Sequence, residues 1–513
     1  MISKALYEFT TITIPVLILS ITLIFFTLYQ YGIKKSRKEK VPLPPGPRGL
    51  PIVGNLPFLD RNLHTYFAKL AETYGPIFKL QLGSKLCVVW NSASIVKEAQ
   101  KEHDIMFANR DVLAVAIPAS YGGTDMIWSP YGEHWRMLRK ICVRELLNNT
   151  RLDALSGLRR KEVQGMVKDI YSKHGNSINI GEYILVTMFH LITSMLWGGT
   201  ELEKEDKNVM VSEFVKVIHE ISELHGQPNV SDFFPVLARF DLQGLGRKAK
   251  RFGSWLDQLL ENVINQREKS LNSNIKHDDF LQVLLKLKDQ EDNKSTLSRT
   301  VLKTLLEDML LAATKSSSTT IEWVMTELIK NPEIMQKVQD EIKEVVGMGN
   351  MVEETHLLKL NYLNAVVKEV MRLHPTVPLL MRSPSASVIL GGYLVPKGTK
   401  ILVNVWAILR DPQYWDDPLM FKPDRFLNSG NDYDYKGTNF SYLPFGTGRR
   451  VCVGIPMAEK MVPYLLASLL HSFDWKLPEA MELDLSATFG LELAKTTPLL
   501  AIPTPRLSGA LYA

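Results

Sequence analysis

The sequence predicts one large, mainly α-helical body with a smaller β-rich part, preceded by a single transmembrane helix. Three observations indicate this. Apolar residues recur with helical periodicity through most of the middle of the chain, two stretches read as extended strands, and the first forty residues contain a long uncharged apolar run. With 513 residues, 45% of them apolar and 22% charged, the chain can bury a large core. No internal repeat and no later proline-rich break divides it, so one body is the simpler prediction.

The apolar run at 9–33 is long enough to cross a bilayer and contains no charged residue. A basic cluster at 34–40 follows the run rather than preceding it, which favours a retained anchor with a cytosolic body over a cleaved signal peptide, the alternative that stays open. We therefore expect a membrane anchor at 1–33, a basic flank and proline-rich hinge at 34–51, and the body at 52–513. A generic linker is the other interpretation of the hinge.

The charge balance and the cysteines exclude several classes of protein. Six of the 60 basic residues and two of the 55 acidic ones lie before residue 41, so the body is almost neutral and has no basic field for nucleic acid. Cys87, Cys142 and Cys452 lie far apart in the sequence. This spacing excludes a disulfide framework and a paired-cysteine zinc site, so each cysteine must be interpreted alone.

The elements of the body can be placed from local patterns. A hairpin is expected from 77–82 and 85–90 around Gly83-Ser84, and a second extended region at 391–406 around a turn at 396–398. Amphipathic helices are expected near 154–173 and 246–269. The strongest helix spans about 297–330, with a capping hydroxyl at its start and Asn331-Pro332 at its end. Its centre, LLAATKSSSTT at 310–320, carries a lysine and six hydroxyl groups.

The stretch PFGTGRRVCVG, 444–454, has the composition of a ligand-binding loop. Its three glycines allow a sharp turn and a close approach to a flat ligand. Cys452 follows two arginines and precedes a helical run, a setting that lowers a thiol pKa and favours metal binding. One cysteine cannot form a four-ligand zinc site, but it can be the axial ligand of a haem iron. Without a ligand, a lone cysteine is most often a small buried hydrophobic residue.

This loop resembles the haem-binding signature of the cytochrome P450 family, F-x-x-G-x-R-x-C-x-G. Every position is filled, by Phe445, Gly448, Arg450, Cys452 and Gly454. The rest of the chain is similar to the family in the same order, and the anchor and the PPGP hinge match its microsomal members, most of all the plant branch that oxidises specialised metabolites. The resemblance covers all 513 residues. It implies the cytochrome P450 fold, haem b with the Cys452 thiolate on its iron, and a single-pass protein of the endoplasmic reticulum membrane.

Two further motifs carry the resemblance. Glu369 and Arg372 lie three residues apart on a helix and can pair, either as a solvated surface pair or, as the family implies, as a triad with Arg425 that locks the cysteine loop. The resemblance also implies that haem propionates are bound by four residues, because the planar arginine fork suits a carboxylate. These are Trp135, Arg139, Arg382 and Arg450.

The long helix departs from the family pattern, which reads roughly A-G-x-D/E-T-T where this chain has AATKSS at 312–317. Thr314, Lys315 and Ser316 are the candidate catalytic residues. Ser316 keeps a hydroxyl that can bond the carbonyl four residues back or an iron-bound ligand. Lys315 replaces the usual acid and inverts the charge. It either extends into a water channel or alters proton delivery.

Two functions remain open at this point. The first is a monooxygenase that uses O2 to hydroxylate a mostly apolar, terpenoid-like metabolite. Its electrons would come from an NADPH-cytochrome reductase, because the chain lacks a dinucleotide-binding fingerprint. The second is a non-oxygenating haem-thiolate reaction, such as a dehydration, an isomerisation or an oxidative rearrangement, which would tolerate the loss of the acid. A haem protein without turnover is disfavoured by the intact loop.

Overall fold

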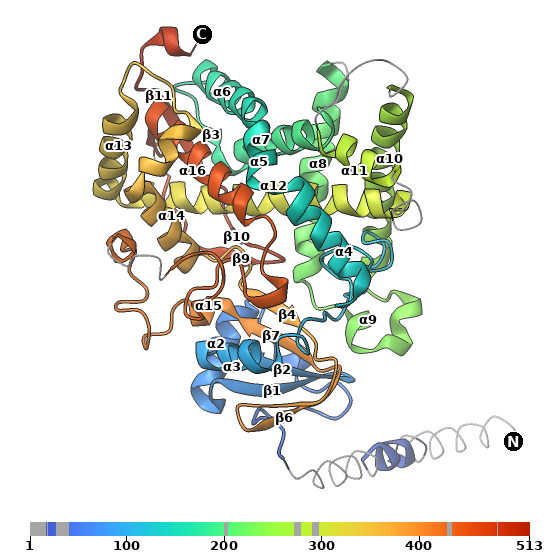
Figure 1. The fold of residues 1–513 in the computed structure, drawn as a ribbon. Coiled ribbons are helices and arrows are strands. Elements are labelled where there is room, and N and C mark those ends of the chain that lie inside the picture. Colours follow the sequence, from blue (N-terminus) through green and yellow to red (C-terminus); the bar gives the residue numbers. More distant parts are fainter. Residues whose placement is uncertain are drawn as a thin grey trace, which may run out of the picture.

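Helices make up most of the computed structural model, which describes residues 17, 19–26, 41–199, 204–270, 279–289, 297–427, 433–479 and 481–512. Most helices fill the upper part of the body in Figure 1, whereas the largest sheet lies at its lower end beside α2 and α3. The predicted fold class, mainly α with a smaller β part, is confirmed.

The helices are α2 (Leu63–Tyr74), α3 (Ala93–His103), α4 (Glu133–Ile141), α5 (Asn149–Ala154), α6 (Ser156–Ser172), α7 (Ile180–Trp197), α8 (Lys204–Gly226), α9 (Val230–Phe233), α10 (Leu245–Ser270), α11 (Phe280–Asp289), α12 (Arg299–Lys330), α13 (Pro332–Val346), α14 (Asn361–Leu373), α15 (Val405–Ile408) and α16 (Ile455–Ser472). The strands are β1 (Ile77–Leu82), β2 (Lys85–Trp90), β3 (Ile178–Asn179), β4 (Leu379–Arg382), β5 (Val388–Leu390), β6 (Tyr393–Val395), β7 (Lys400–Asn404), β8 (Phe473–Lys476), β9 (Ala487–Phe489), β10 (Leu493–Lys495) and β11 (Leu500–Pro505).

The largest sheet has the strand order β1-β2-β7-β4. The predicted first hairpin is confirmed at both ends, since Leu82 pairs with Lys85 across a turn in which Gly83 has φ +57°. A left-handed residue at this position suits glycine. The second extended region is divided by its turn, because β6 pairs with β5 whereas β7 joins the largest sheet beside β2. Strand β7 ends at Asn404, whose side chain caps α15.

The long helix predicted at about 297–330 is α12, which crosses the middle of the helical region in Figure 1. The Ser298 hydroxyl caps its start by accepting from the Val301 N–H at 3.3 Å, and the chain leaves the helix at Asn331. Most of its 32 residues are buried, with α7 packed along it. Burial on all sides explains why apolar residues occur all round this helix rather than along one stripe.

One helix among the described residues, α7, has the length and hydropathy of a membrane span, but 67% of it is buried in the body. It is therefore a core helix. Most of the predicted anchor at 9–33 lies outside the described residues. The described ones, 17 and 19–26, are helical and exposed.

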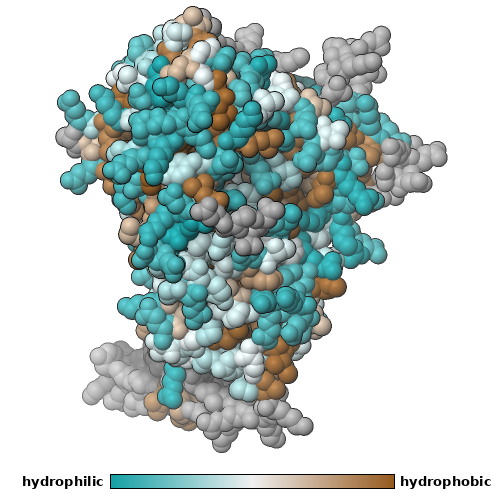
Figure 2. All heavy atoms as spheres, turned by 60° about the vertical axis from the view of Figure 1, so that its left-hand side comes forward, coloured by the Kyte–Doolittle hydropathy of each residue, from teal (hydrophilic) through white to brown (hydrophobic). Residues whose placement is uncertain are grey.

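Part of the predicted hinge packs against the body. The Lys79 N–H of β1 donates to the Pro45 carbonyl at 2.7 Å, and the Lys79 ammonium donates to the Pro44 carbonyl at 2.6 Å. The Leu394 N–H of β6 donates to the Pro42 carbonyl at 2.9 Å. These contacts fix the direction in which the chain enters the body. Figure 2 shows hydrophilic residues over most of the face in view, with hydrophobic ones in small groups among them.

Candidate active site

The loop that carries Cys452 turns sharply before α16. Gly446 and Gly448 have φ of +74° and +68°, in the left-handed region that favours glycine. A Cβ on Gly448 would also collide with the Gln100 side chain. The Cys452 N–H donates to the Phe445 carbonyl at 3.0 Å, which closes the loop, and Gly454 is the N-cap of α16. Cys452 therefore lies two residues before the N-cap of a helix.

The Cys452 thiol is both accessible and surrounded by protein. The residue is exposed, yet burial raises the pKa of its thiol, a combination expected for a group that faces an internal space. Three groups lower the pKa of this thiol. They are the Gly454 N–H, which donates to Sγ at 3.3 Å, and the guanidinium groups of Arg139 and Arg110. The sequence predicts a lowered thiol pKa, and the structure differs because burial outweighs these groups. A coordinated metal ion would reverse the balance.

Four arginines lie close together near this loop: Arg110, Arg139, Arg382 and Arg450. Burial lowers the pKa of each, and the other guanidinium groups lower the pKa of Arg450 further. Arg382 and Arg450 line one small cavity together with Thr447 and Leu443. Within the described part of the chain, none of the four has a carboxylate within ion-pair distance. A buried cation cluster of this kind needs anionic partners.

Trp135 lies between two of these arginines. The Arg450 guanidinium stands 4.5 Å from the centre of its ring and the Arg139 guanidinium 5.5 Å. The Trp135 indole N–H donates to the Met126 carbonyl at 3.0 Å, and Arg450 donates to the same oxygen at 3.1 Å. Arg450 also donates to the Ala108 carbonyl at 2.6 Å. The structure thus brings Trp135, Arg139 and Arg450 together, and backbone carbonyls accept the hydrogen bonds of Trp135 and Arg450.

Sequence reasoning missed Arg110. Its Nη1 donates to the Ile127 carbonyl at 2.8 Å, whereas its buried Nε has no partner among the described residues. No local pattern singles out one arginine in the stretch ANRDV, because its role depends on Arg382 and Arg450, which lie more than 250 residues further along the chain.

The middle of α12 presents a short open face in an otherwise buried helix. Ala312 is exposed, and Leu311, Ala313 and Ser316 are half-buried, whereas Leu310 and Thr314 are fully buried. Ala312 and Ser316 lie four residues apart and share one side of the helix, while Thr314 points to the other. The Ser316 hydroxyl donates to the Ala312 carbonyl at 2.5 Å, and the Thr314 hydroxyl to the Leu310 carbonyl at 2.8 Å.

Lys315 lies at the edge of this open face and is 8% exposed. Its ammonium contacts Nε2 of His219, on α8, at 3.4 Å. Glu322 and Glu492 lie near enough for Lys315 to lower the pKa of each carboxyl, although burial raises both pKa values above the usual range. Among the described residues no carboxylate reaches ion-pair distance of Lys315.

These features fit one group. An accessible thiol just before a helix suits the axial position of an iron, and buried arginines with no described carboxylate at ion-pair distance suit the two carboxylates of a haem. The sequence comparisons agree. A family model for cytochrome P450 matches residues 44–501. The chain belongs to the cytochrome P450 family.

Relatives of this P450 cover nearly its whole length. It is 39% identical over 502 residues to a flavonoid 3'-monooxygenase from Crocosmia x crocosmiiflora, covering 96% of this chain and 98% of the relative. It is 38% identical over 506 residues to a geraniol 8-hydroxylase from Swertia mussotii, covering 97% and 99%. A zebra fish cytochrome P450 solved with progesterone superposes with a TM-score of 0.74 and 25% identity, covering 86% of this chain and 99% of that one.

The family and fold imply a haem whose iron has an axial cysteine thiolate. They also show that this P450 is an oxygen-incorporating oxidoreductase that acts on a small molecule with O2 and a reductase.

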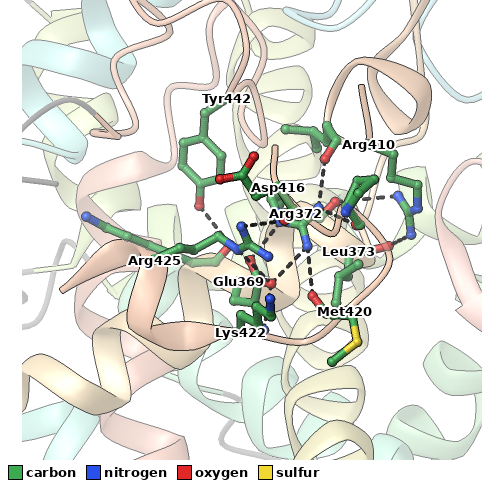
Figure 3. Close-up of polar contacts among 12 residues, drawn as sticks. Glu369, Arg372, Leu373, Arg410, Asp416, Met420, Lys422, Arg425 and Tyr442 are labelled. Atoms are coloured by element: carbon green, nitrogen blue, oxygen red, sulfur yellow. Dashed lines mark hydrogen bonds and ion pairs between the residues drawn. The ribbon is translucent and has the colours of Figure 1, made fainter. Parts of the chain in front are cut away.

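The Glu369 carboxylate of this P450 binds both arginines of the predicted triad (Figure 3). It pairs with Arg372 through two bonds of 2.7 and 2.8 Å and with Arg425 at 3.1 Å. Glu369 and Arg372 are fully buried, so this is not a solvated surface pair. Arg372 also donates to the carbonyls of Leu409, Pro418 and Met420, which ties α14 to the segment before the cysteine loop.

Proposed function

We propose that this P450 hydroxylates a mostly apolar specialised metabolite, with Cys452 as the axial ligand of its haem. The observation that carries the proposal is the accessible Cys452 thiol just before α16, next to buried arginines that have no carboxylate within ion-pair distance among the described residues. Bound haem supplies the oxygen chemistry. The remaining roles belong to side chains that hold the haem, position the substrate and move protons.

The haem-holding residues act through shape and charge. The loop from Phe445 to Gly454 positions the Cys452 sulfur, and the Gly454 N–H stabilises its charge. Trp135 packs against the guanidinium groups of Arg139 and Arg450, which would bind the propionates, with Arg382 and Arg110 as further partners. The triad of Glu369, Arg372 and Arg425 keeps the preceding segment in place.

The substrate would lie against the open face of α12. Leu311, Ala312 and Ala313 offer apolar surface there, and the small alanines leave space. Relatives of this chain include a geraniol hydroxylase and flavonoid monooxygenases. We propose a terpenoid-like substrate, because the open face offers apolar side chains and the Ser316 hydroxyl is already bonded to the Ala312 carbonyl.

Lys315 supports a second candidate function. It stands where the family usually has an acid, and it contacts α8 through His219 rather than pairing with a carboxylate. A non-oxygenating reaction such as a dehydration, an isomerisation or an oxidative rearrangement would not need an acid at this position. In a monooxygenase, Lys315 would instead alter proton delivery past Ser316, with Thr314 holding the helix geometry.

The electron donor would be a membrane-bound NADPH-cytochrome reductase. Arg136, Lys140 and Arg449 are exposed. The guanidinium groups of Arg136 and Arg449 lie 5.5 and 5.4 Å from the centre of the Tyr131 ring, so these two share a surface near the cysteine loop, where Arg449 also pairs with Asp104. We propose the endoplasmic reticulum membrane as the location, with the body in the cytosol. The exposed apolar residues between 17 and 26 support a membrane anchor.

The product decides between the two candidate functions. Purified protein should be reconstituted with a reductase and a panel of terpenoid alcohols and hydrocarbons, with and without NADPH. A product heavier by one oxygen atom that requires NADPH supports hydroxylation. An NADPH-independent product that has lost water, or has the mass of the substrate, contradicts it. The carbon monoxide difference spectrum of the reduced protein reports the thiolate separately.

A further inference from the structure

Helix α8 shares the main apolar core with α12, but polar contacts between the two helices are few. Among the described residues, one hydrogen bond joins the two helices, and it is the contact at 3.4 Å between the Lys315 ammonium and Nε2 of His219. The other polar contacts of α8 run to α10, through Arg251 and Trp255, and to the turn between β9 and β10. Lys315 is therefore the polar contact point between α12 and α8 in the described part of the chain.

The C-terminal part of α8 is also packed tightly on the turn between β9 and β10. The Leu491 N–H donates to the Ser222 carbonyl at 3.2 Å, and the Ser222 hydroxyl donates to the Glu492 carboxyl at 2.7 Å. A Cβ on Gly226 would come within 2.5 Å of the Gly490 Cα, so the two backbones meet directly. Because Glu492 also lies near Lys315, both α8 and this turn approach the ammonium group that α12 presents.

The hydrogen bonds define which nitrogen of His219 carries the proton. Nδ1 lies 2.7 Å from the Val215 carbonyl, which can only accept, so Nδ1 carries the hydrogen. Nε2 is then a lone-pair acceptor, and the Lys315 ammonium donates to it. Protonation of Nε2 would remove the acceptor and place two cations side by side.

We propose that the Lys315–His219 contact is a pH-dependent tie that holds α8 against α12 at the edge of the substrate cavity, and that protonation of His219 releases it. His219 and Lys315 are positioning residues in this role. The inference rests on the proposed function in one respect, that the open face of α12 beside Lys315 borders the substrate cavity.

The charged groups around the pair shift the pKa of His219 in both directions. Glu182 on α7 and Glu223 on α8 raise the pKa of His219, whereas Glu322 and Glu492 face Lys315. His219 stays exposed over part of its surface, yet its buried part and the Lys315 ammonium outweigh the two acids and lower its pKa. The tied state therefore holds fewer protons than the released state. The tie is fully present above the ordinary histidine pKa of 6.5 and weakens as the pH falls below it.

Hydrogen exchange on α8 tests the tie in the haem-loaded, full-length protein. Peptides from 209–226 should be followed at about pH 7.5 and about pH 5.5, on either side of the ordinary histidine pKa, with rates corrected for intrinsic exchange. We expect exchange in the wild type to be several-fold faster at the lower pH, up to about tenfold for one pH unit below the ordinary pKa. Peptides from α13, which contains no histidine, should show no such change.

Three variants make the test specific. His219→Gln keeps an acceptor but cannot titrate, so its α8 exchange should be slow at both pH values. His219→Phe lacks the acceptor, so its exchange should be fast at both. His225→Gln removes the other described histidine of α8, which bonds the Ile221 carbonyl and does not contact Lys315, and its pH dependence should match the wild type. A pH dependence that persists in His219→Gln, or that disappears in His225→Gln, would overturn the proposal.

Binding of a hydrophobic triazole to the haem iron tests the role at the cavity. The triazole does not titrate in this range, and its affinity is read from the absorption spectrum. We expect its dissociation constant to change between the two pH values in the wild type and to stay constant in His219→Gln. An unchanged constant in the wild type, with faster α8 exchange, would contradict the role at the cavity and leave the proposed monooxygenase function to the product assay.

Discussion

The cysteine loop and the middle of α12 differ in how closely they keep the family pattern and in what holds them. The loop fills every position of the signature and is fixed by backbone hydrogen bonds, glycine turns and a fully buried ion pair behind it. The α12 stretch replaces a glycine and an acid, and its Lys315 is held by one contact to a different helix. The family match implies that the thiolate chemistry is retained, and the proposed changes, in proton supply and in the tie between α8 and α12, both concern Lys315.

The largest expected effect comes from Cys452→Ser, because no other described cysteine can reach the same position. Cys87 and Cys142 are both fully buried, and burial raises the pKa of each thiol. We expect the carbon monoxide spectrum of thiolate-ligated haem and all NADPH-dependent product to disappear. Cys142→Ala should keep both. A thiolate spectrum that survives in Cys452→Ser would show that the cysteine loop is not the site.

Arg372→Ala should destabilise the protein by about 3–5 kcal/mol, because it leaves the buried Glu369 carboxylate without its closest partner. Denaturant unfolding of the haem-loaded protein measures the change. Arg160→Ala is the matched control, since that arginine pairs with Glu353 at the surface and should change the stability far less. Equal effects of the two changes would show that the buried ion pair behind the cysteine loop stabilises the protein no more than a surface pair does.

Arg110→Met should act in opposite directions on the two forms of the protein. Without haem, removal of one of four neighbouring buried cations should raise the midpoint of thermal unfolding, because repulsion falls. With haem, the loss of a propionate partner should speed the transfer of haem to an acceptor such as apomyoglobin by several-fold. Destabilisation of both forms would show that Arg110 is only a packing residue.

The smallest effects are expected at α12, and they concern coupling rather than folding. Lys315→Asp restores the usual acid, and we expect it to raise the product formed per NADPH consumed by a few-fold. Ser316→Ala should lower the same ratio by a few-fold. An unchanged ratio in both variants would show that Lys315 and Ser316 have only a structural role in α12.

Elements defined by local chemistry could be predicted from the sequence. The hairpin bounds follow from alternation around Gly83, and the ends of α12 follow from Ser298 and Asn331. The cysteine loop could be found because its glycines, arginines and thiol are contiguous. Arg110 and His219 could not, because each acts through a partner far away in the sequence, Arg382 in one case and Lys315 in the other. The raised pKa of the Cys452 thiol also depends on burial by distant segments.

The most direct test of the central claim, oxygen insertion at the Cys452 centre, is the source of the oxygen in the product. Reconstituted protein should be supplied with NADPH, reductase and isotopically heavy O2, in ordinary water, with a metabolite that it converts. We expect one heavy oxygen atom in the product. A product without the label, formed at the same rate when NADPH is absent, would contradict a monooxygenase and favour the non-oxygenating reaction.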